Sequence, residues 1–318
     1  MKYEVKVHGR IGSRLQRVAE SELAAAIAQL EAIGRNDVVH ATHETRKHLK
    51  KLRALLSLLR SALGAATAKP AATALRDAGR CLRSLRDAHV LVRALDVLRQ
   101  RSCETRHPAI IAHARRLLIA AEQRAHARCL RDGTAPEVIA TLREVLKNLR
   151  EWELSAFRWK DARRAIRRSY RRARQAHHAV VRQPTDTRLH TWRKRLKELL
   201  YHARLLRPAD PAFMDLLIQE LKVLTEFLGD DRDLALLRAV LRRHRARLQR
   251  PRQFTALIGM LDLRCRELRR AALDLGAHLL AESPAAFARE LDGRRAALRA
   301  INESARRLAP RLDARKAG

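Results

Sequence analysis

The chain has 318 residues, of which 47% are hydrophobic and 3% aromatic, and its 68 Lys and Arg residues outnumber 34 Asp and Glu residues to leave a net charge of +34. The hydrophobic fraction is too high for a disordered chain, and the scarcity of aromatic rings disfavours recognition of single-stranded nucleic acid by base stacking. So large a positive charge opposes compaction, and we therefore expect a polyanionic partner: nucleic acid, an anionic membrane surface or a phosphate polymer.

Nine prolines stand where helices are expected to begin or end, and only 11 glycines interrupt the chain. Alternating runs typical of strands are nearly absent beyond YEVKV at residues 3–7. The sequence therefore predicts an all-α fold. The expected helices cover residues 11–34, 38–63, 69–105, 108–132, 136–155, 158–182, 185–206, 210–248, 252–281 and 284–308.

Four cysteines, Cys81, Cys103, Cys129 and Cys265, are too far apart for a CxxC metal site, and we expect them to be small buried residues in a reducing compartment. The first residues, MKYEVKVHG, lack the apolar stretch of a signal peptide. No apolar run reaches the roughly 18 residues that a membrane span requires. We therefore expect a soluble, cytoplasmic protein.

The helices contain an internal repeat. HETRKHLKKL at His43 returns as HTWRKRLKEL at His190, 147 positions later, and both copies match H-x-x-R-K-x-x-K-x-L. RDAHVL at Arg86 returns as RDLALL at Arg232, 146 positions later, and two helix-opening prolines are 148 positions apart. Three pairs in nearly one register predict an internal duplication that forms two helical bundles. The expected bundles cover residues 10–157 and 158–310.

Both copies of the repeated helix carry cations on one side. Positions i, i+3, i+4 and i+7 share a helix face, and the leucines of both copies fall on the opposite face, which is expected to join a core. A third basic face is expected on the helix over residues 158–182. The first face comprises His43, Arg46, Lys47 and Lys50, the second His190, Arg193, Lys194 and Lys197, and the third Lys160, Arg163, Arg164, Arg167, Arg171 and Arg174.

A basic helix face is usually only a solvated surface. Here the nearest acids, Glu44 and Glu198, are expected at the flanks of the faces rather than as partners within them. Like charges stacked along a helix cost stability, so three such faces indicate a bound polyanion. Two roles stay open for His43 and His190: donating to phosphate when protonated, or fixing the contact between the bundles through hydrogen bonds. Neither has nearby residues at metal-ligand spacing.

The duplicated H-x-x-R-K-x-x-K helix, followed about 40 residues later by an R-D-x-x-V/L-L helix, resembles the CHAD family, the conserved histidine α-helical domain, over about residues 10 to 310. The resemblance implies two pseudo-symmetric bundles packed about a central basic channel that binds inorganic polyphosphate, and with it targeting to, or organisation of, polyphosphate granules and contact with granule proteins. By position it implies binding by His43, Arg46, Lys47, Lys50, Arg53, His190, Arg193, Lys194 and Lys197.

The second half departs from this pattern. Glu198 and Leu200 stand in the places of Lys51 and Arg53, which predicts a shorter second face and an asymmetric channel.

An enzymatic role is not expected. LGDDRDLALL at residues 228–237 invites comparison with the aspartate-rich metal site of isoprenoid synthases, but Leu234 stands where that motif needs Asp. Asp87 and Asp233 are instead expected to pair with neighbouring Arg or Lys. The sequence contains no GxxxxGK[ST], HExxH or GxSxG motif. We therefore predict no catalytic residue, no metal and no cofactor.

Two alternatives to polyphosphate stay open. Duplex nucleic acid would bind the same basic faces through its phosphates, and net charge alone does not separate the two ligands. Adsorption to anionic lipid needs bulky apolar residues beside the charge, and only Trp152, Phe157 and Trp159 cluster in this way. We expect these three side chains to pack at the junction of the halves, and no membrane partner is predicted.

Overall fold

The computed structural model describes residues 2–33, 38–101, 108–248 and 250–316. These ranges contain helices and no strand, so the all-α prediction is confirmed. The helices are α1 (Ile11–Glu31), α2 (Val38–Cys81), α3 (Arg83–Arg101), α4 (Pro108–Arg131), α5 (Thr134–Leu149), α6 (Trp159–Arg182), α7 (Asp186–Leu205), the 3₁₀ helix η1 (Arg207–Ala209), α8 (Pro211–Arg243), α9 (Arg245–Leu248), α10 (Pro251–Leu279) and α11 (Pro284–Lys316).

The helix α2 consists of two antiparallel limbs, residues 38–63 and 65–81, joined at Gly64. Gly64 has φ 73° and ψ 171°, a conformation that residues with a Cβ rarely adopt. The Arg46 guanidinium donates a hydrogen bond to the Gly79 carbonyl, 33 positions away, whereas a straight helix would separate them by roughly 50 Å. The chain therefore reverses at Gly64, and a helix end near residue 63 was predicted correctly.

Several predicted boundaries were wrong. The expected helix over residues 69–105 is broken, because the second limb of α2 ends at Cys81 and α3 begins at Arg83. The segment expected over 210–248 divides into α8 and α9. Among the cysteines, Cys265 is buried as expected, Cys129 is half-buried and Cys81 is exposed, contrary to the prediction; Cys103 lies outside the described residues.

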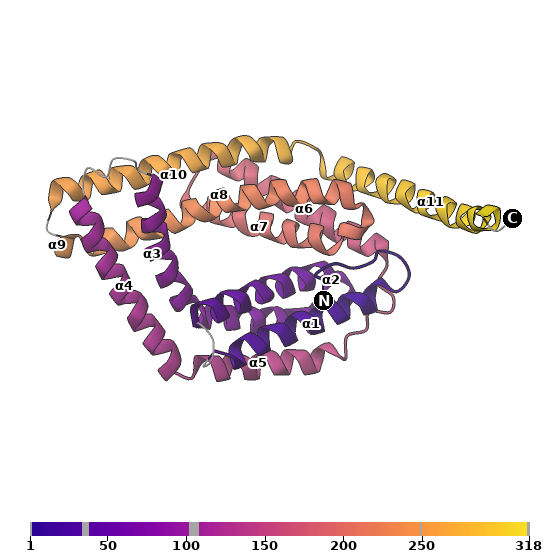
Figure 1. Cartoon of the computed structure of the whole chain (residues 1–318), viewed down its shortest axis with the longest axis horizontal. Helices are drawn as coiled ribbons and strands as arrows, with labels where there is room; N and C mark the ends of the chain where they lie inside the picture. The colour runs from indigo at the N-terminus through magenta and orange to yellow at the C-terminus, as the bar shows by residue number, and fades with distance from the viewer. Residues whose placement is uncertain (1, 34–37, 102–107, 249, 317–318) are drawn as a thin grey trace.

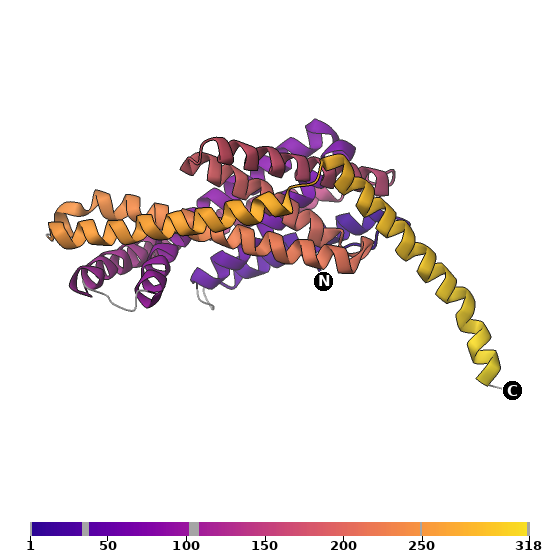
Figure 2. The ribbon, with the colours of Figure 1, turned by 90° about the horizontal axis from the view of Figure 1, so that it is seen from above.

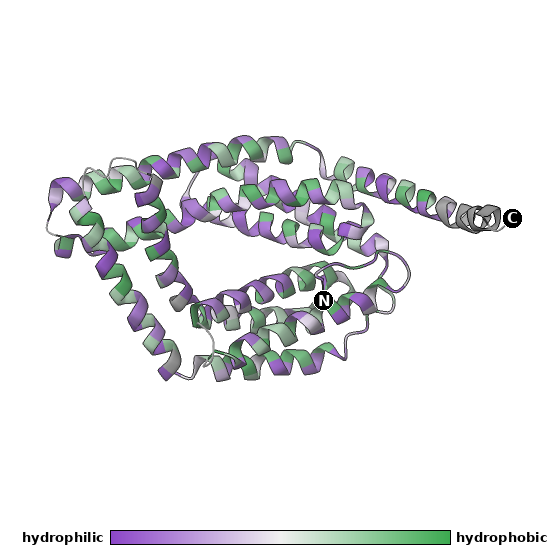
Figure 3. Cartoon of the chain, in the orientation of Figure 1, coloured by the Kyte–Doolittle hydropathy of each residue, from purple (hydrophilic) through white to green (hydrophobic). Residues whose placement is uncertain are grey.

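Two hydrophobic clusters hold the helices together. The larger one joins α1, α2 and α5 to α6, α7 and the first part of α8. The smaller one, at the end of the molecule formed by α3 and α4, includes Leu95 and Ile110 from the first half of the sequence and Leu237 and Leu261 from the second. Figure 3 shows hydrophilic and hydrophobic residues alternating along these helices. Both halves of the chain therefore contribute to each cluster.

The first limb of α2 crosses α7 at a polar joint. His202, 1% exposed, donates from Nε2 to the Ala54 carbonyl at 2.8 Å, and its Nδ1 lies 3.0 Å from the Ser169 hydroxyl. The Ser57 hydroxyl donates to Glu198 one turn away. Because buried polar groups lose stability unless they are paired, these contacts fix where the two helices cross.

The first residues tie the two halves together on one side of this crossing. The Tyr3 hydroxyl donates to the Lys51 carbonyl at 2.7 Å, and the Val5 N–H donates to the Leu205 carbonyl at 2.8 Å. The YEVKV run is thus an extended segment packed on helices rather than a strand. Further along, Trp152 and Phe157 are buried in the larger hydrophobic cluster and Trp159 packs against it, half-buried.

Close packing between α7 and α10 depends on Gly276. Trp192 on α7 is fully buried, and a Cβ at Gly276 would lie 2.5 Å from its Cζ2 atom. By contrast, a Cβ at Gly259 in the same helix α10 would meet no atom within 4 Å.

We expect Gly276→Ala to lower the free energy of unfolding by about 1–3 kcal/mol, because Trp192 must move within a packed core. Gly259→Ala is the matched control and should raise it by roughly 0.5–1 kcal/mol, since alanine restricts the unfolded chain and favours the helix. Urea denaturation of both variants measures the difference. Equal stabilities of Gly276→Ala and the unsubstituted protein would show that Trp192 does not lie where described.

Candidate functional site

The first limb of α2 and α7 bring their basic faces towards each other beyond the polar joint. Around the Lys50 amine lie the charges of Arg46 on α2, Arg86 on α3 and Arg193 and Lys197 on α7. We call these five residues the inner basic cluster. The structure therefore unites members of the first two predicted faces and adds Arg86, which was recognised in the sequence only as part of a repeat.

Lys50 shows how closely these charges are packed. The side chain is open to solvent, yet the surrounding protein removes much of the water around its amine, and the neighbouring cations add repulsion. Together they lower the pKa of Lys50 to about 7. Loss of hydration, followed by the charges of Arg193 and Arg204, lowers the pKa of Lys197 to about 8. Both amines therefore lie among other cations with reduced hydration.

Arg193 has spare hydrogen-bonding capacity. Its Nε is buried and has no hydrogen-bond partner among the residues described. The guanidinium lies flat against Gly229 of α8, where a Cβ would come within 3.0 Å of Nη2. Loss of hydration is the main cause that lowers the pKa of Arg193, and the charges of Arg86 and Arg232 add to it, opposed by Asp233. A buried donor without an acceptor points to an anionic ligand.

Two carboxylates hold part of this charge in place. Asp233 on α8 accepts from Arg86 on α3 at 3.2 Å, and Asp87 accepts from Arg83 at 2.9 Å. The prediction that Asp87 and Asp233 pair with neighbouring arginines is confirmed. The Arg86–Asp233 pair also joins the two halves of the sequence through their repeated RD motifs, because it links α3 to α8.

The two histidines differ in their surroundings. Arg232 donates from Nη1 to Nδ1 of His190 at 2.8 Å, so that ring nitrogen carries no proton. Burial and the adjacent Arg232 lower the pKa of His190 to about 4. This contact gives His190 a positioning role between α7 and α8. His43 is exposed, and loss of hydration lowers its pKa, with Glu44 acting in the opposite direction.

The other members of the first two faces lie at the edge of the cluster. Lys47 is bound by Glu44 at 2.9 Å, so the expectation that Glu44 would stand outside the face was wrong: the i, i+3 spacing brings the two side chains together. Glu198 does lie at the flank, where Arg195 contacts it at 3.3 Å. Lys194 and Arg53 are both exposed, and the charge of Arg53 acts on Lys194.

The third predicted face does not reach the inner basic cluster as one unit. Arg163 pairs with Asp292 on α11 at 2.8 Å, and Arg174 donates to the Leu280 carbonyl at 3.0 Å. Arg164 lies 3.9 Å from Asp161 within α6, Lys160 lines a different cavity, and Arg167 and Arg171 are exposed.

A neighbouring face of α6 approaches α2 and α7 instead. Arg168 lies 3.4 Å from the Ser57 carbonyl, and Arg172 lies 3.7 Å from Glu198. Each is one residue further along the helix than a member of the predicted face, a rotation of about 100°. Periodicity located the charge on α6 but not the side that meets the other helices.

Sequence reasoning also missed further cations beside the predicted faces. Arg204 and Lys222 act on Lys197, and Arg76 and Arg80 act on Arg53. Arg204 lies on α7 seven residues after Lys197, so helical spacing could have shown it. Spacing within one helix cannot show Lys222 on α8 or Arg76 and Arg80 on the second limb of α2, and only the repeated RD motif marked Arg86 and Arg232.

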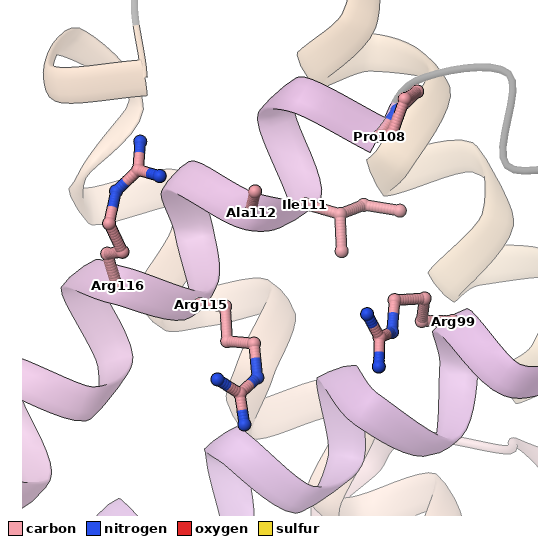
Figure 4. Close-up of a pocket in the computed structure, with 6 residues that line it drawn as sticks. All are labelled: Arg99, Pro108, Ile111, Ala112, Arg115 and Arg116. Atoms are coloured by element: carbon pink, nitrogen blue, oxygen red, sulfur yellow. The ribbon is translucent and has the colours of Figure 1, made fainter.

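Two cavities lie away from the inner basic cluster. The smaller, of about 410 Å³, is formed by α3 and α4 and is shown in Figure 4; its lining includes Arg99, Ile111 and Arg115, and Asp96 holds Arg115 at 2.8 Å. The larger, of about 930 Å³, lies beside α11.

No group of three metal-ligating side chains occurs within the described ranges, and no helix there is long and apolar enough to cross a membrane.

Comparisons with known proteins agree with this architecture. PptA from Streptomyces chartreusis is similar in structure with a TM-score of 0.64 and 20% identity, over 85% of this chain and 99% of that chain. The crystal structure of the CHAD domain from the plant Ricinus communis gives a TM-score of 0.62 and 17% identity, over 88% and 93%. Likenesses at these identities show a common fold. No curated protein matches the sequence.

A family model described as CHAD domain matches residues 17–242, which is more than half of the chain and includes both copies of the repeated helix. The chain belongs to the CHAD domain family.

Proposed function

We propose that the protein binds inorganic polyphosphate at the inner basic cluster and that it does so without chemical turnover. The observation that carries this proposal is Lys50, whose pKa of about 7 reflects cations held close together on three helices. Asp87 and Asp233 compensate only part of the mutual repulsion of these cations in the free protein. A polyanion that enters the cluster would relieve it and would supply an acceptor for the buried Nε of Arg193.

The arrangement of the cations favours a thin ligand over a duplex. The cations that act on Lys50 come from three helices, α2, α3 and α7, rather than from one helix face. A phosphate polymer has anionic oxygens all along a narrow chain and can be contacted from several sides at once. Duplex nucleic acid presents its phosphates on a wide cylinder, which suits an outward basic face.

The continuation of charge on both sides supports a passage through the molecule. Arg204 and Lys222 extend the series beyond Lys197, and Arg76 and Arg80 extend it beyond Arg53. We propose that a polyphosphate chain runs along this series, through a basic channel between two duplicated halves that meet near residue 157. Binding of this kind suits recruitment to polyphosphate granules in the cytoplasm.

Turnover is not part of the proposal, because the carboxylates beside the cluster are already engaged. Asp87 and Asp233 are both held by arginines. A general base must be able to accept a proton from an attacking water, and a carboxylate bound to a guanidinium is poorly suited to that task.

Substituting Lys50, Arg193 and Lys197 together by Met should lower affinity for long-chain polyphosphate at least 100-fold. The slope of log affinity against log salt concentration should also fall by about two, since roughly 0.7 counterion is released per contact in flexible polyanions. Thermal stability should stay the same or rise, because crowded cations have been removed. Affinity measurements at several salt concentrations test all three parts.

The matched control replaces Arg124, Arg128 and Lys147, which are exposed on α4 and α5, by Met. It removes the same charge away from the cluster and should change affinity by less than about threefold. If the control loses as much affinity as the cluster variant, binding follows net charge and the proposed site is wrong.

Polyphosphate binding at pH 8 should take up protons. In the free protein Lys50 and Lys197 have pKa values of about 7 and 8, so both are largely or partly neutral at that pH. Bound phosphate favours their charged forms and raises both values. Affinity should therefore fall as pH rises from about 6.5 to 9.

Calorimetry at pH 8 in two buffers of different ionisation enthalpy measures this uptake directly. The observed heats should differ between the buffers in the unsubstituted protein and agree in the variant that lacks both lysines. Equal heats for the unsubstituted protein would show that these amines do not contact the ligand.

A further inference from the structure

A second candidate binding surface lies where α11 leaves the body of the molecule. A cavity of about 930 Å³ opens between the extended amino-terminal segment, the start of α6, η1 and α11. Figure 2 shows α11 continuing past this point away from the other helices. The cavity is separate from the inner basic cluster, since the two have no residue in common.

The lining combines apolar side chains with cations. A concave surface of this composition fits a ligand that has both an apolar side and negative charge. Glu303 is an acid among the lining residues. The apolar part includes Val7, Ile11, Trp159 and Leu298, and the cationic part comprises Arg158, Lys160, Arg295 and Arg299.

Arg295 and Trp159 form a fixed wall. The guanidinium carbon of Arg295 lies 4.7 Å from the centroid of the Trp159 ring, and Nη2 donates to the Val7 carbonyl at 3.1 Å. The indole N–H of Trp159 donates to Asp292 at 2.6 Å. A cation stacked on an aromatic ring and held by a carbonyl is already oriented, so a ligand carboxylate would meet it at little entropic cost.

The apolar part of the cavity continues outward along α11. Leu298 is half-buried in the cavity wall, and Ile301, one turn further, is 64% exposed. α11 contacts the body mainly through α6 and η1, which lie on the near side of this point. An apolar stripe that continues from a cavity onto a projecting helix is suited to a second helix lying alongside.

The positive charge of this surface determines which kind of helix could bind to it. A second copy of this chain would bring another +34 to a surface that is already cationic, so self-association is disfavoured. A flat anionic membrane would not reach into a concave cavity whose Trp159 ring is covered by Arg295. Arg299 is already held by Glu303 at 2.7 Å. We propose that this surface binds an acidic amphipathic helix of another protein, with its apolar side against Leu298 and Ile301 and its carboxylates against Arg158, Lys160 and Arg295.

The probe is a fluorescent peptide of three Leu-Glu-Glu-Leu-Leu-Glu-Glu repeats, whose binding is followed by anisotropy. Its control has the same composition with the leucines redistributed so that they form no helical stripe. Ile301→Glu should weaken binding of the striped peptide at least about tenfold, because it places a negative charge opposite the glutamates. Leu263→Glu on α10, at a residue 52% exposed, is the matched control and should change affinity less than twofold.

Two further binding measurements distinguish this surface from the inner basic cluster and peptide binding from lipid binding. The variant with Met at residues 50, 193 and 197 should bind the striped peptide within about twofold of the unsubstituted protein, because the two surfaces have no lining residue in common. The proposal is overturned if the redistributed peptide binds equally well, if the cluster variant loses peptide binding, or if Ile301→Glu has no effect. Binding to phosphatidylglycerol vesicles that depends on Ile301, without peptide binding, would assign the surface to lipid instead.

Discussion

The candidate site depends on contacts that hold several positively charged side chains close together. Lys50, Arg193 and Lys197 repel one another, and the surrounding protein deprives them of water, so the cluster exists only because other contacts fix α2 against α7. The large hydrophobic cluster supplies most of that stability. The joint of His202 with Ala54 sets the crossing point, and the pair of Arg86 with Asp233 joins α3 to α8 on the other side.

This constraint links the fold to the proposed function. A protein that only needed solubility would gain by spreading its cations over the surface, where salt and water screen them. Here cations from three helices lie close together, and two acids are arranged to position arginines rather than to neutralise the whole group. The buried Nε of Arg193, which has no hydrogen-bond partner within the described part of the chain, would be available to the proposed ligand. The cavity beside α11 has apolar residues between its cations, and we therefore propose a different kind of partner for it.

Much of the fold follows from helical periodicity and proline placement in the sequence. The helices and the opposed apolar and basic faces of α2 and α7 depend on local spacing, so they were predictable. The site was predictable only in part. His190, Arg193 and Lys197 share a face on any helix, but the positions of Arg86 and Arg232 depend on how α3 and α8 pack. Glu44 and Lys47 are three residues apart on one helix, so their pairing could have been predicted from the sequence. By contrast, α6 turns Arg168 rather than Arg167 towards α2 because tertiary contacts set the rotation of that helix.

Competition between polyphosphate and duplex DNA is the most direct test of a site shaped for a thin polyanion. Labelled long-chain polyphosphate would be bound at physiological salt and challenged with duplex DNA at matched phosphate concentration. If the cations face inward across α2, α3 and α7, DNA should fail to displace the polyphosphate. Equal displacement by DNA would contradict this, because it would show that the net charge of +34 acts as an open surface that any polyanion can occupy.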